Sequence, residues 1–428
     1  MSSSMLNNLP EDVLMDIFAR LPVKSLLQFK CVCKSWCNLI KDPIFITKHV
    51  NQSALSNNGY LAVTRQGSTF GGNCSISLIS YETFREVIRI TIPSKEYGKA
   101  PFTIVGSCNG ILCLNVSEIG DTNFLFNPAT SEFKELPKPN YPIHELKEDT
   151  ISDFIGLGFG YEPESNDYKL VRISYSKRLE NQFYSGVDVY SLSTNSWRRK
   201  NRLVLGTVLV NSFSKAFING ALHWRGVTLK RGDVRCHIIS FDVGSEVTRY
   251  IKLPYKIDLA KEEWWPFVRN GSLAMVIRSK THEEHHYIFN IWVMNEYGVK
   301  KSWTKQLTVG PLFVLKLVEC GMNEELLFAT HSTMYLYDLQ RIKPPHDDIL
   351  EADIIGNNFV PWVEVVNHIE SLVTIEGTKV YAKRVRKNSW FGKYFIFFQL
   401  FFGLVVMVAY VVILPKLIHF LYPTNVSE

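Results

Sequence analysis

The stretch LPEDVLMDIFARLPVKSLLQFKCVCKSWCNLIKDPIF, from Leu9 to Phe45, predicts a small helical unit at the start of the chain. Pro10 suits the first turn of a helix, and the acidic Glu11 and Asp12 favour the positive end of the helix dipole. Apolar side chains follow at helical spacing and give this helix one apolar face: Val13, Leu14, Ile17, Phe18 and Leu21.

Pro22 ends the first helix, because the residue before a proline is disfavoured in the α conformation. A second apolar set runs from Val23 to Val32, and Trp36, Leu39 and Ile40 indicate a third short helix. Three short helices cannot bury so many apolar groups among themselves. A partner protein or the body of this chain must therefore cover part of them.

These residues resemble the F-box, the module that docks onto the Skp-type linker of a Skp–cullin–F-box ubiquitin ligase. The resemblance implies the linker and, through it, a cullin as partners. The residues that it assigns to linker binding are Leu9, Pro10, Ile17, Leu21, Pro22, Leu26, Val32, Cys33 and Trp36. A helical hairpin packed on its own domain is the alternative.

The composition of the 428 residues, 46% hydrophobic and 21% charged, is that of a globular protein. The aromatic share of 13% suits a sheet-rich body. The net charge of +6 is modest for this length, so nucleic-acid binding is not expected. Eight cysteines without a framework spacing, and no secretory signal, indicate free thiols in a reducing compartment.

No motif of a catalytic or metal site stands out, so we expect neither an enzyme nor a cofactor. The sequence shows no glycine-rich phosphate loop, nucleophile elbow or metalloprotease histidine pair. Cys31, Cys33 and Cys37 lack a second ligand cluster, and the last two fit a helix face as small apolar residues. The histidines of HEEHH at residues 282–286 fall in a charged loop, where a solvated role is favoured over metal binding.

A polar linker follows Phe45, and short β-rich runs follow the linker. A unit that opens with an asparagine turn and continues into an apolar strand recurs every 51 to 57 residues. The recurring asparagines are Asn58, Asn109, Asn166, Asn219, Asn270 and Asn323. Each copy continues into a second strand, a hairpin and a third strand.

This repeat predicts a mainly β fold: a three-helix module followed by a six- or seven-bladed β-propeller-like ring. The number stays open because Glu376–Tyr381 is a candidate closing strand. The expected domains are an F-box over residues 5–48 and the propeller-like domain over residues 58–382. A pair of β-sandwiches is the alternative.

The body also resembles the F-box-associated, kelch-like domain of plant F-box proteins, although Gly71-Gly72 is its only kelch-type double glycine. The motifs that carry the resemblance are Cys108–Cys113, Phe126–Thr130, Gly158–Tyr161, Asn166–Val171, Val189–Leu192 with Trp197, Ile218–Trp224 and Glu370–Val373. The resemblance implies a non-catalytic receptor that holds a target protein in the β domain for ubiquitination. Candidate recognition loops are Pro137–Asp153, Lys177–Gln182 and Lys280–His286, with plain solvated loops as the alternative.

Residues 394–414, YFIFFQLFFGLVVMVAYVVIL, predict a transmembrane helix, since 21 uncharged residues span about 30 Å. Basic residues cluster before the segment, which places the larger N-terminal part in the cytosol. With only residues 415–428 behind it, insertion after translation is expected. The F-box-associated family does not usually carry such a span. A membrane-tethered interaction scaffold that engages no cullin is therefore the alternative function, and cytosol or nucleus the alternative location.

Overall fold

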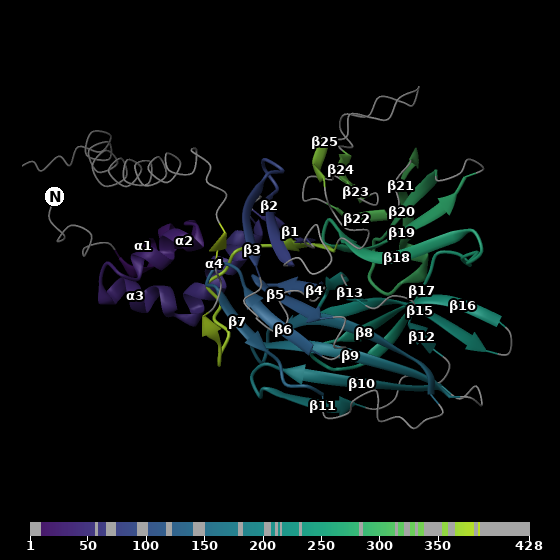
Figure 1. The fold of residues 1–428 in the computed structure, drawn as a ribbon, viewed down its shortest axis with the longest axis horizontal. Helices are drawn as coiled ribbons and strands as arrows, with labels where there is room; N and C mark the ends of the chain where they lie inside the picture. Colours follow the sequence, from purple (N-terminus) through teal and green to yellow (C-terminus); the bar gives the residue numbers. More distant parts are fainter. Residues whose placement is uncertain are drawn as a thin grey trace, which may run out of the picture. The chain divides into compact units, whose positions relative to one another are not determined.

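The computed structural model describes residues 10–385, apart from 56–58, 66–73, 92–101, 117–121, 140–149, 179–182, 201–206, 210–212, 215, 231–232, 282–285, 313–315, 321–325, 330–332, 338–352, 358–363 and 381–383. The chain divides into two compact units, residues 1–384 and 385–428, and the fold described below is that of the first. Helices come first and strands follow (Figure 1).

Four helices form the helical unit: α1 (Glu11–Ala19), α2 (Val23–Phe29), α3 (Lys34–Lys41) and α4 (Pro43–Leu55). Pro10 and Pro22 lie in extended conformation just before α1 and α2, where the missing N–H is not needed. The rings of Phe18, Phe29 and Trp36 pack with centroids 4.9 to 5.5 Å apart and form the centre of the unit.

The fourth helix corrects the expected polar linker after Phe45. The carboxylate of Asp42 accepts a hydrogen bond from the Ile44 N–H at 2.7 Å, which caps the start of α4. Phe45 and Val50 are then buried one turn or more apart, and His49 Nε2 donates to the Leu21 carbonyl at 2.9 Å. The polar residues of 51–55 continue this helix because its other face is already anchored in the core.

The strands form six sheets, numbered here in chain order. Sheet 1 contains β26 (Val365–His368), β1 (Tyr60–Arg65), β2 (Ser75–Ser80), β3 (Glu86–Thr91) and β28 (Arg384–Val385). Sheet 2 contains β4 (Phe102–Cys108), β5 (Ile111–Val116), β6 (Thr122–Asn127), β7 (Glu132–Glu135) and β27 (Lys379–Val380). Sheet 3 contains β13 (Phe213–Ser214), β8 (Thr150–Glu162), β9 (Asp167–Arg178), β10 (Phe183–Ser191) and β11 (Ser196–Lys200).

Sheet 4 contains β12 (Thr207–Leu209), β14 (Ala216–Ile218), β15 (Ala221–Lys230), β16 (Asp233–Asp242) and β17 (Thr248–Lys252). Sheet 5 contains β18 (Glu262–Arg269), β19 (Ser272–Lys280), β20 (Tyr287–Met294) and β21 (Trp303–Leu312), with the short helix η4 (Lys300–Ser302) before β21. Sheet 6 contains β22 (Lys316–Cys320), β23 (Leu326–Ala329), β24 (Thr333–Tyr337) and β25 (Asp353–Asn357).

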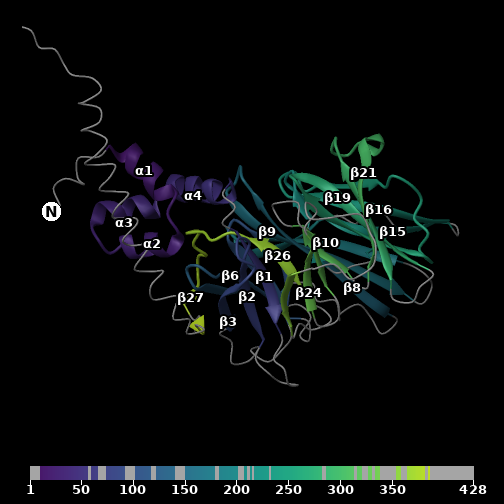
Figure 2. The ribbon, with the colours of Figure 1, turned by 90° about the horizontal axis from the view of Figure 1, so that it is seen from above.

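A buried apolar cluster lies between each sheet and the next, so the sheets form a closed ring, as in a propeller (Figure 2). The last cluster joins sheet 6 to sheet 1, where Leu327 and Met334 pack with Leu61 and Val63. This closure rules out the alternative of two sandwiches. A seventh sheet is not formed by the described strands.

The closing strand is not the one expected. The C-terminal β26 pairs with β1 and so joins the two ends of the ring. Lys379 and Val380, from the expected closing segment, instead pair with Phe133 and Glu132 at the outer edge of sheet 2. The reason is burial on both faces of the sheet: Val365 packs with Leu61 and Val63 on one side of β1, and Val366 packs with Ala62 on the other. The more polar sequence of residues 376–381 offers no such apolar pair.

The asparagine turns of the sequence repeat are confirmed where they are described. Asn109, Asn219 and Asn270 have φ of 48°, 51° and 47°, and a glycine with positive φ follows each. Two successive positive φ values fit the right-handed twist of a hairpin, which explains the Asn-Gly pairs. The structure adds a strand before each of these turns (β4, β14 and β18) that the three-strand unit of the prediction lacked.

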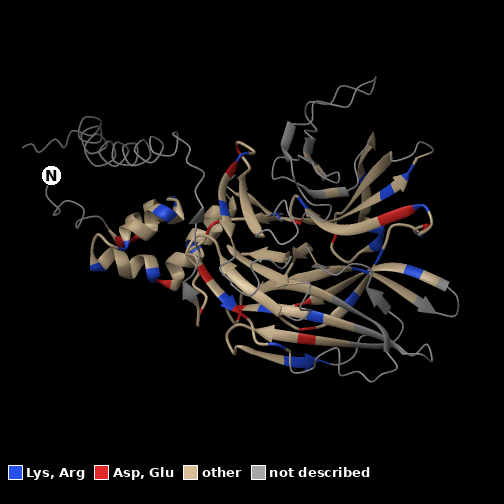
Figure 3. Ribbon diagram, viewed as in Figure 1, with Lys and Arg blue, Asp and Glu red and all other residues tan. Residues whose placement is uncertain are grey.

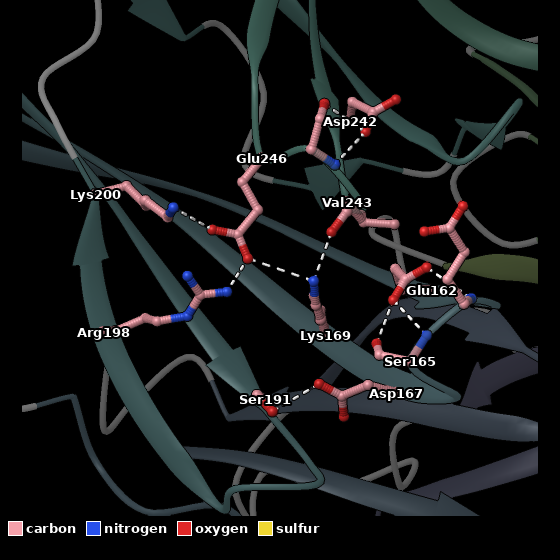
Figure 4. Close-up of polar contacts among 12 residues, drawn as sticks. Glu162, Ser165, Asp167, Lys169, Ser191, Arg198, Lys200, Asp242, Val243 and Glu246 are labelled. Atoms are coloured by element: carbon pink, nitrogen blue, oxygen red, sulfur yellow. Dashed lines mark hydrogen bonds and ion pairs between the residues drawn. The ribbon is translucent and has the colours of Figure 1, made fainter.

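A charge cluster around the buried Glu246 holds sheet 3 against sheet 4 (Figure 4). The Glu246 side chain is only 4% exposed and accepts hydrogen bonds from Arg198 and from Lys169, the latter at 3.3 Å. Lys169 also donates to the Val243 carbonyl at 2.7 Å, and Lys200 lies 2.7 Å from the second Glu246 oxygen. Each member has a charged or carbonyl partner, so the cluster is a structural joint between sheets.

Candidate functional site: the exposed face of the helical unit

The helical unit keeps apolar side chains in solvent although it has a buried apolar core. Val32, in the turn between α2 and α3, is 61% exposed, and Val13 on α1 is 39% exposed. Pro10, Pro22 and Cys33 are also exposed. Five apolar or weakly polar side chains on so small a unit form a surface that a partner can cover.

Eight of the nine residues predicted to bind a linker are described, and they fall into three groups by burial. Pro10, Pro22, Val32 and Cys33 are exposed, and Ile17 and Leu21 are half-buried. Leu26 and Trp36 are buried, at 0% and 9% exposure. Leu9 lies outside the described residues.

Leu26 and Trp36 are buried inside the helical unit, and their assignment to linker binding stays a prediction. Trp36 packs edge-on against Phe18 at 4.9 Å, and Leu26 belongs to the same buried cluster. A partner reaches neither side chain while the helices keep this packing. Leu26 and Trp36 hold the exposed residues in place. The assignment of all nine residues to linker binding stays a prediction.

Sequence reasoning missed two exposed apolar residues of α4, Ile44 at 72% and Leu55 at 82% exposure. They border a shallow hollow of about 520 Å³ that Thr47, Lys48 and Asn51 also line. The sequence signal for this surface is the apolar spacing that begins at Pro43. The sequence prediction ends the helical unit at Phe45, before this helix is complete. Ile44 thus offers an exposed apolar side chain outside the predicted set.

Charge surrounds the exposed apolar residues on the helical unit. Lys34 and Lys41 on α3 are exposed, and burial, followed by the positive charge of Lys41, lowers the pKa of Lys30. On the other side, a hydrogen bond from Lys48 holds the pKa of the Asp16 carboxyl below its usual range. An apolar patch with lysines beside it suits a partner surface that is apolar with an acidic border.

Among the residues that the structure describes, no group of histidine, cysteine or acidic side chains is placed to hold a metal ion. Cys31 and Cys33 are exposed and do not converge with other ligands. Lysine, arginine and acidic residues are interspersed along the described ribbon (Figure 3).

The three candidate recognition loops lie at one end of the sheets. Consecutive connections in an antiparallel sheet alternate between its two ends, so the β7–β8, β9–β10 and β19–β20 connections all lie away from the asparagine turns. Most of their residues (140–149, 179–182 and 282–285) lie outside the described part, and β8 already begins at Thr150 and β9 continues to Arg178. Strands therefore take up the end of the first predicted loop and the start of the second.

The predicted transmembrane segment, residues 394–414, lies outside the described residues. Within the described ranges, no helix is both long enough and apolar enough to cross a bilayer.

Comparisons with known proteins find a family match for the helical unit and another for the ring. Residues 72–375 match the F-box associated beta propeller domain, and residues 6–48 match the F-box domain. Among curated proteins of Arabidopsis thaliana, the F-box protein At3g07870 is 27% identical over 406 residues, covering 86% of this chain and 92% of its own. The F-box/kelch-repeat protein At3g23880 is 27% identical, covering 71% and 80%, and the F-box protein CPR1 is 27% identical, covering 70% and 73%.

Proposed function

The chain belongs to the F-box proteins that carry an F-box-associated β-propeller domain, and we propose that it is the substrate receptor of a Skp–cullin–F-box ubiquitin ligase. The helical unit binds the Skp-type linker, and the ring holds the target protein. No bond is made by the chain itself. It raises the effective concentration of target lysines near the ubiquitin donor.

The observation that carries the proposal is the exposure of Val32. An apolar side chain that is 61% exposed between two helices contributes nothing to the core of the unit. Buried in an interface, a side chain of this size gains about 1.5 kcal/mol or more. Pro10, Pro22 and Cys33 are exposed on the same unit and extend the surface.

Val32→Asp tests the docking surface. A carboxylate there is solvated in the free chain but must lose water in an apolar interface, so affinity for the purified Skp-type linker falls at least about tenfold, or about 1.4 kcal/mol. Isothermal titration of the full chain with the linker measures this. Ile44→Asp is the matched control, since Ile44 is also exposed but lies outside the predicted docking set.

If both variants lose affinity equally, or if neither variant loses affinity, Val32 does not belong to the docking surface. Purification of the intact protein also separates the two function hypotheses. Linker, cullin and ubiquitinated protein recovered together support the receptor. Linker without a cullin supports an interaction scaffold instead.

We place target binding at the end of the ring away from the asparagine turns. The strands before and after the β7–β8, β9–β10 and β19–β20 connections end and begin there, and loops on a rigid scaffold commonly carry recognition. The described β17–β18 connection adds Tyr255 and Leu259, which are 38% and 41% exposed. Charge-reversal of the β7–β8 connection should abolish target capture and leave linker binding unchanged.

We further propose that residues 394–414 anchor the protein to a membrane with the ring in the cytosol. The proposal is supported by the uncharged 21-residue run and by the basic residues before it. Carbonate extraction tests it: the full chain should stay in the membrane pellet and a chain without residues 394–428 should be released. Equal release of both proteins would contradict the anchor.

A further inference from the structure

A segment of the C-terminal part of the ring enters the core of the helical unit. The segment Glu370–Gly377, here called the brace, runs from β26 to β27 and lies between the helices and sheet 2 (Figures 1 and 2). Leu372 of the brace is fully buried, and it shares one apolar cluster with Phe18, Ile40 and Phe45 of the helices. Ala129, in the turn between β6 and β7, belongs to the same cluster.

One buried side chain of the ring shapes this contact from both sides. The Asn127 amide nitrogen donates to the Ser371 carbonyl at 3.2 Å and to the Val373 carbonyl at 2.7 Å, which flank Leu372. Its amide oxygen accepts from the Ala129 N–H at 2.9 Å. Asn127 thus holds the backbone around Leu372 and the turn that carries Ala129 in one arrangement.

The rest of the brace is fastened along its length. Ser371 Oγ donates to the Asn109 carbonyl at 2.6 Å. The Ile375 N–H donates to Glu132 Oε2 at 2.8 Å, and Lys134 Nζ donates to the Glu376 carbonyl at 2.9 Å.

These contacts explain two sequence motifs that the docking surface does not use. Phe126–Thr130 supplies the clamp and the turn, and Glu370–Val373 supplies Ser371 and Leu372. The two motifs lie far apart in sequence and meet under the helices. Their chemistry serves the joint between helical unit and ring.

We propose that the brace fixes the orientation of the helical unit on the ring and that Leu372 and Asn127 are positioning residues for ubiquitin transfer. The inference rests on the proposed function, in which the linker binds the helices and the target binds the far end of the ring. One covalent connection, residues 56–59, joins α4 to β1, and the brace adds a second attachment through the apolar cluster around Leu372. With the brace seated, target lysines stay at a set distance from the ubiquitin donor.

Distance measurements on the full chain in detergent test the brace. Spin labels on a keto amino acid, which spares the native cysteines, replace the exposed Gln28 on α2 and Glu164 in the β8–β9 turn. The unmodified brace should give a single narrow distance distribution by double electron–electron resonance. Leu372→Asp places a charge in the apolar cluster, and Asn127→Asp removes both donors to the brace, so each should abolish the narrow peak.

Thr374→Asp is the matched control, because Thr374 lies in the same segment with its side chain exposed, and the narrow peak should remain. The ring of Asn127→Asp should still unfold in one cooperative thermal transition, at a lower temperature because the carboxylate is buried, and this separates a loosened joint from a lost ring. A narrow peak retained in Leu372→Asp would overturn the proposal. If Leu372→Asp fails to fold or to capture the linker, Asn127→Asp decides by the same criterion.

A reconstituted ligase separates failure of the brace from failure of the proposed function. The readout is the set of the chain's own lysines that receive ubiquitin, identified by mass spectrometry. The brace predicts a restricted set in the unmodified chain and a spread to further lysines in Asn127→Asp. An unchanged set contradicts the brace, whereas no ubiquitin on any lysine contradicts the receptor function.

Discussion

The helical unit and the ring use their apolar residues in opposite ways. In the ring, large side chains such as Trp224 are buried between sheets, and the Trp224 indole N–H donates to the Leu157 carbonyl at 3.0 Å. In the helical unit, Val32 and Ile44 remain in solvent although Phe18 and Leu26 close a core beside them. A closed ring of sheets buries its apolar faces between neighbouring sheets, whereas a unit of four short helices is too small to bury all of its apolar side chains. The part left open is therefore available to a partner.

The largest effect should come from opening the core of the ring. Trp224→Ala removes a buried indole between sheets 3 and 4 and leaves a cavity, so the free energy of unfolding should fall by about 3 to 5 kcal/mol. Urea unfolding followed by tryptophan fluorescence measures it. Val247→Ala, at an exposed apolar position of sheet 4's last turn, should change stability by less than about 0.5 kcal/mol. Similar losses in the two variants would contradict the contrast between closed ring and exposed surface.

Two glycines in equivalent turns should sharpen the comparison between ring and joint. Gly110 and Gly220 both have positive φ, of 80° and 69°. A Cβ on Gly110 would meet a brace side chain, Ser371, at under 3 Å, whereas a Cβ on Gly220 meets nothing within 4 Å. Gly220→Ala should therefore cost about 1 kcal/mol of backbone strain, and Gly110→Ala about 2 kcal/mol or more. Equal losses of unfolding free energy in the two variants, measured by urea unfolding, would show that Ser371 of the brace moves away from a Cβ at residue 110 at little cost.

The smallest expected effect is a pH dependence of the ring. Burial lowers the pKa of His223 to about 4, and its Nδ1–H donates to the Ala216 carbonyl while Nε2 accepts from the Tyr297 hydroxyl at 2.7 Å. Unfolded histidine titrates near about 6.5. Between about pH 6.5 and pH 4 the unfolded chain binds a proton that the folded ring rejects, so stability present above pH 6.5 is lost as the pH falls.

Urea unfolding of the unmodified chain and of His223→Gln at pH 7 and pH 5 measures this dependence. The unmodified chain should lose more stability between the two pH values than His223→Gln does. His368, whose pKa burial lowers to about 3, keeps a residual dependence in the variant. An identical loss in both proteins would mean that His223 accepts a proton in the folded ring.

The sequence revealed features that depend on local chemistry. Asn109, Asn219 and Asn270 mark hairpin turns because positive φ selects asparagine and glycine, and this holds without knowledge of the rest of the chain. Pro10 marks the start of the first helix and Pro22 follows its end, for equally local reasons. Both sets of predictions are confirmed.

Features that depend on distant packing were missed. Leu26 and Trp36 sit in the same pattern as the exposed Val32, and only the packing around Phe18 shows that they face inward. The innermost strand β4 has buried side chains on both faces, so it lacks the alternation that marks a half-exposed strand. The helix α4 continues through polar residues because Phe45 packs in the apolar cluster of the helical unit and His49 donates a hydrogen bond to the Leu21 carbonyl. The partnership of Asn127 with Ser371 and Val373 joins residues too far apart for any sequence pattern to relate.

Hydrogen–deuterium exchange of the full chain with and without the purified Skp-type linker tests the central contrast most directly. The account predicts slower exchange in residues 10–36 on addition of the linker and unchanged exchange in the strands of sheets 3 to 6. Protection that appears in those strands, or no protection between Pro10 and Trp36, would contradict the assignment of the open surface to the helical unit.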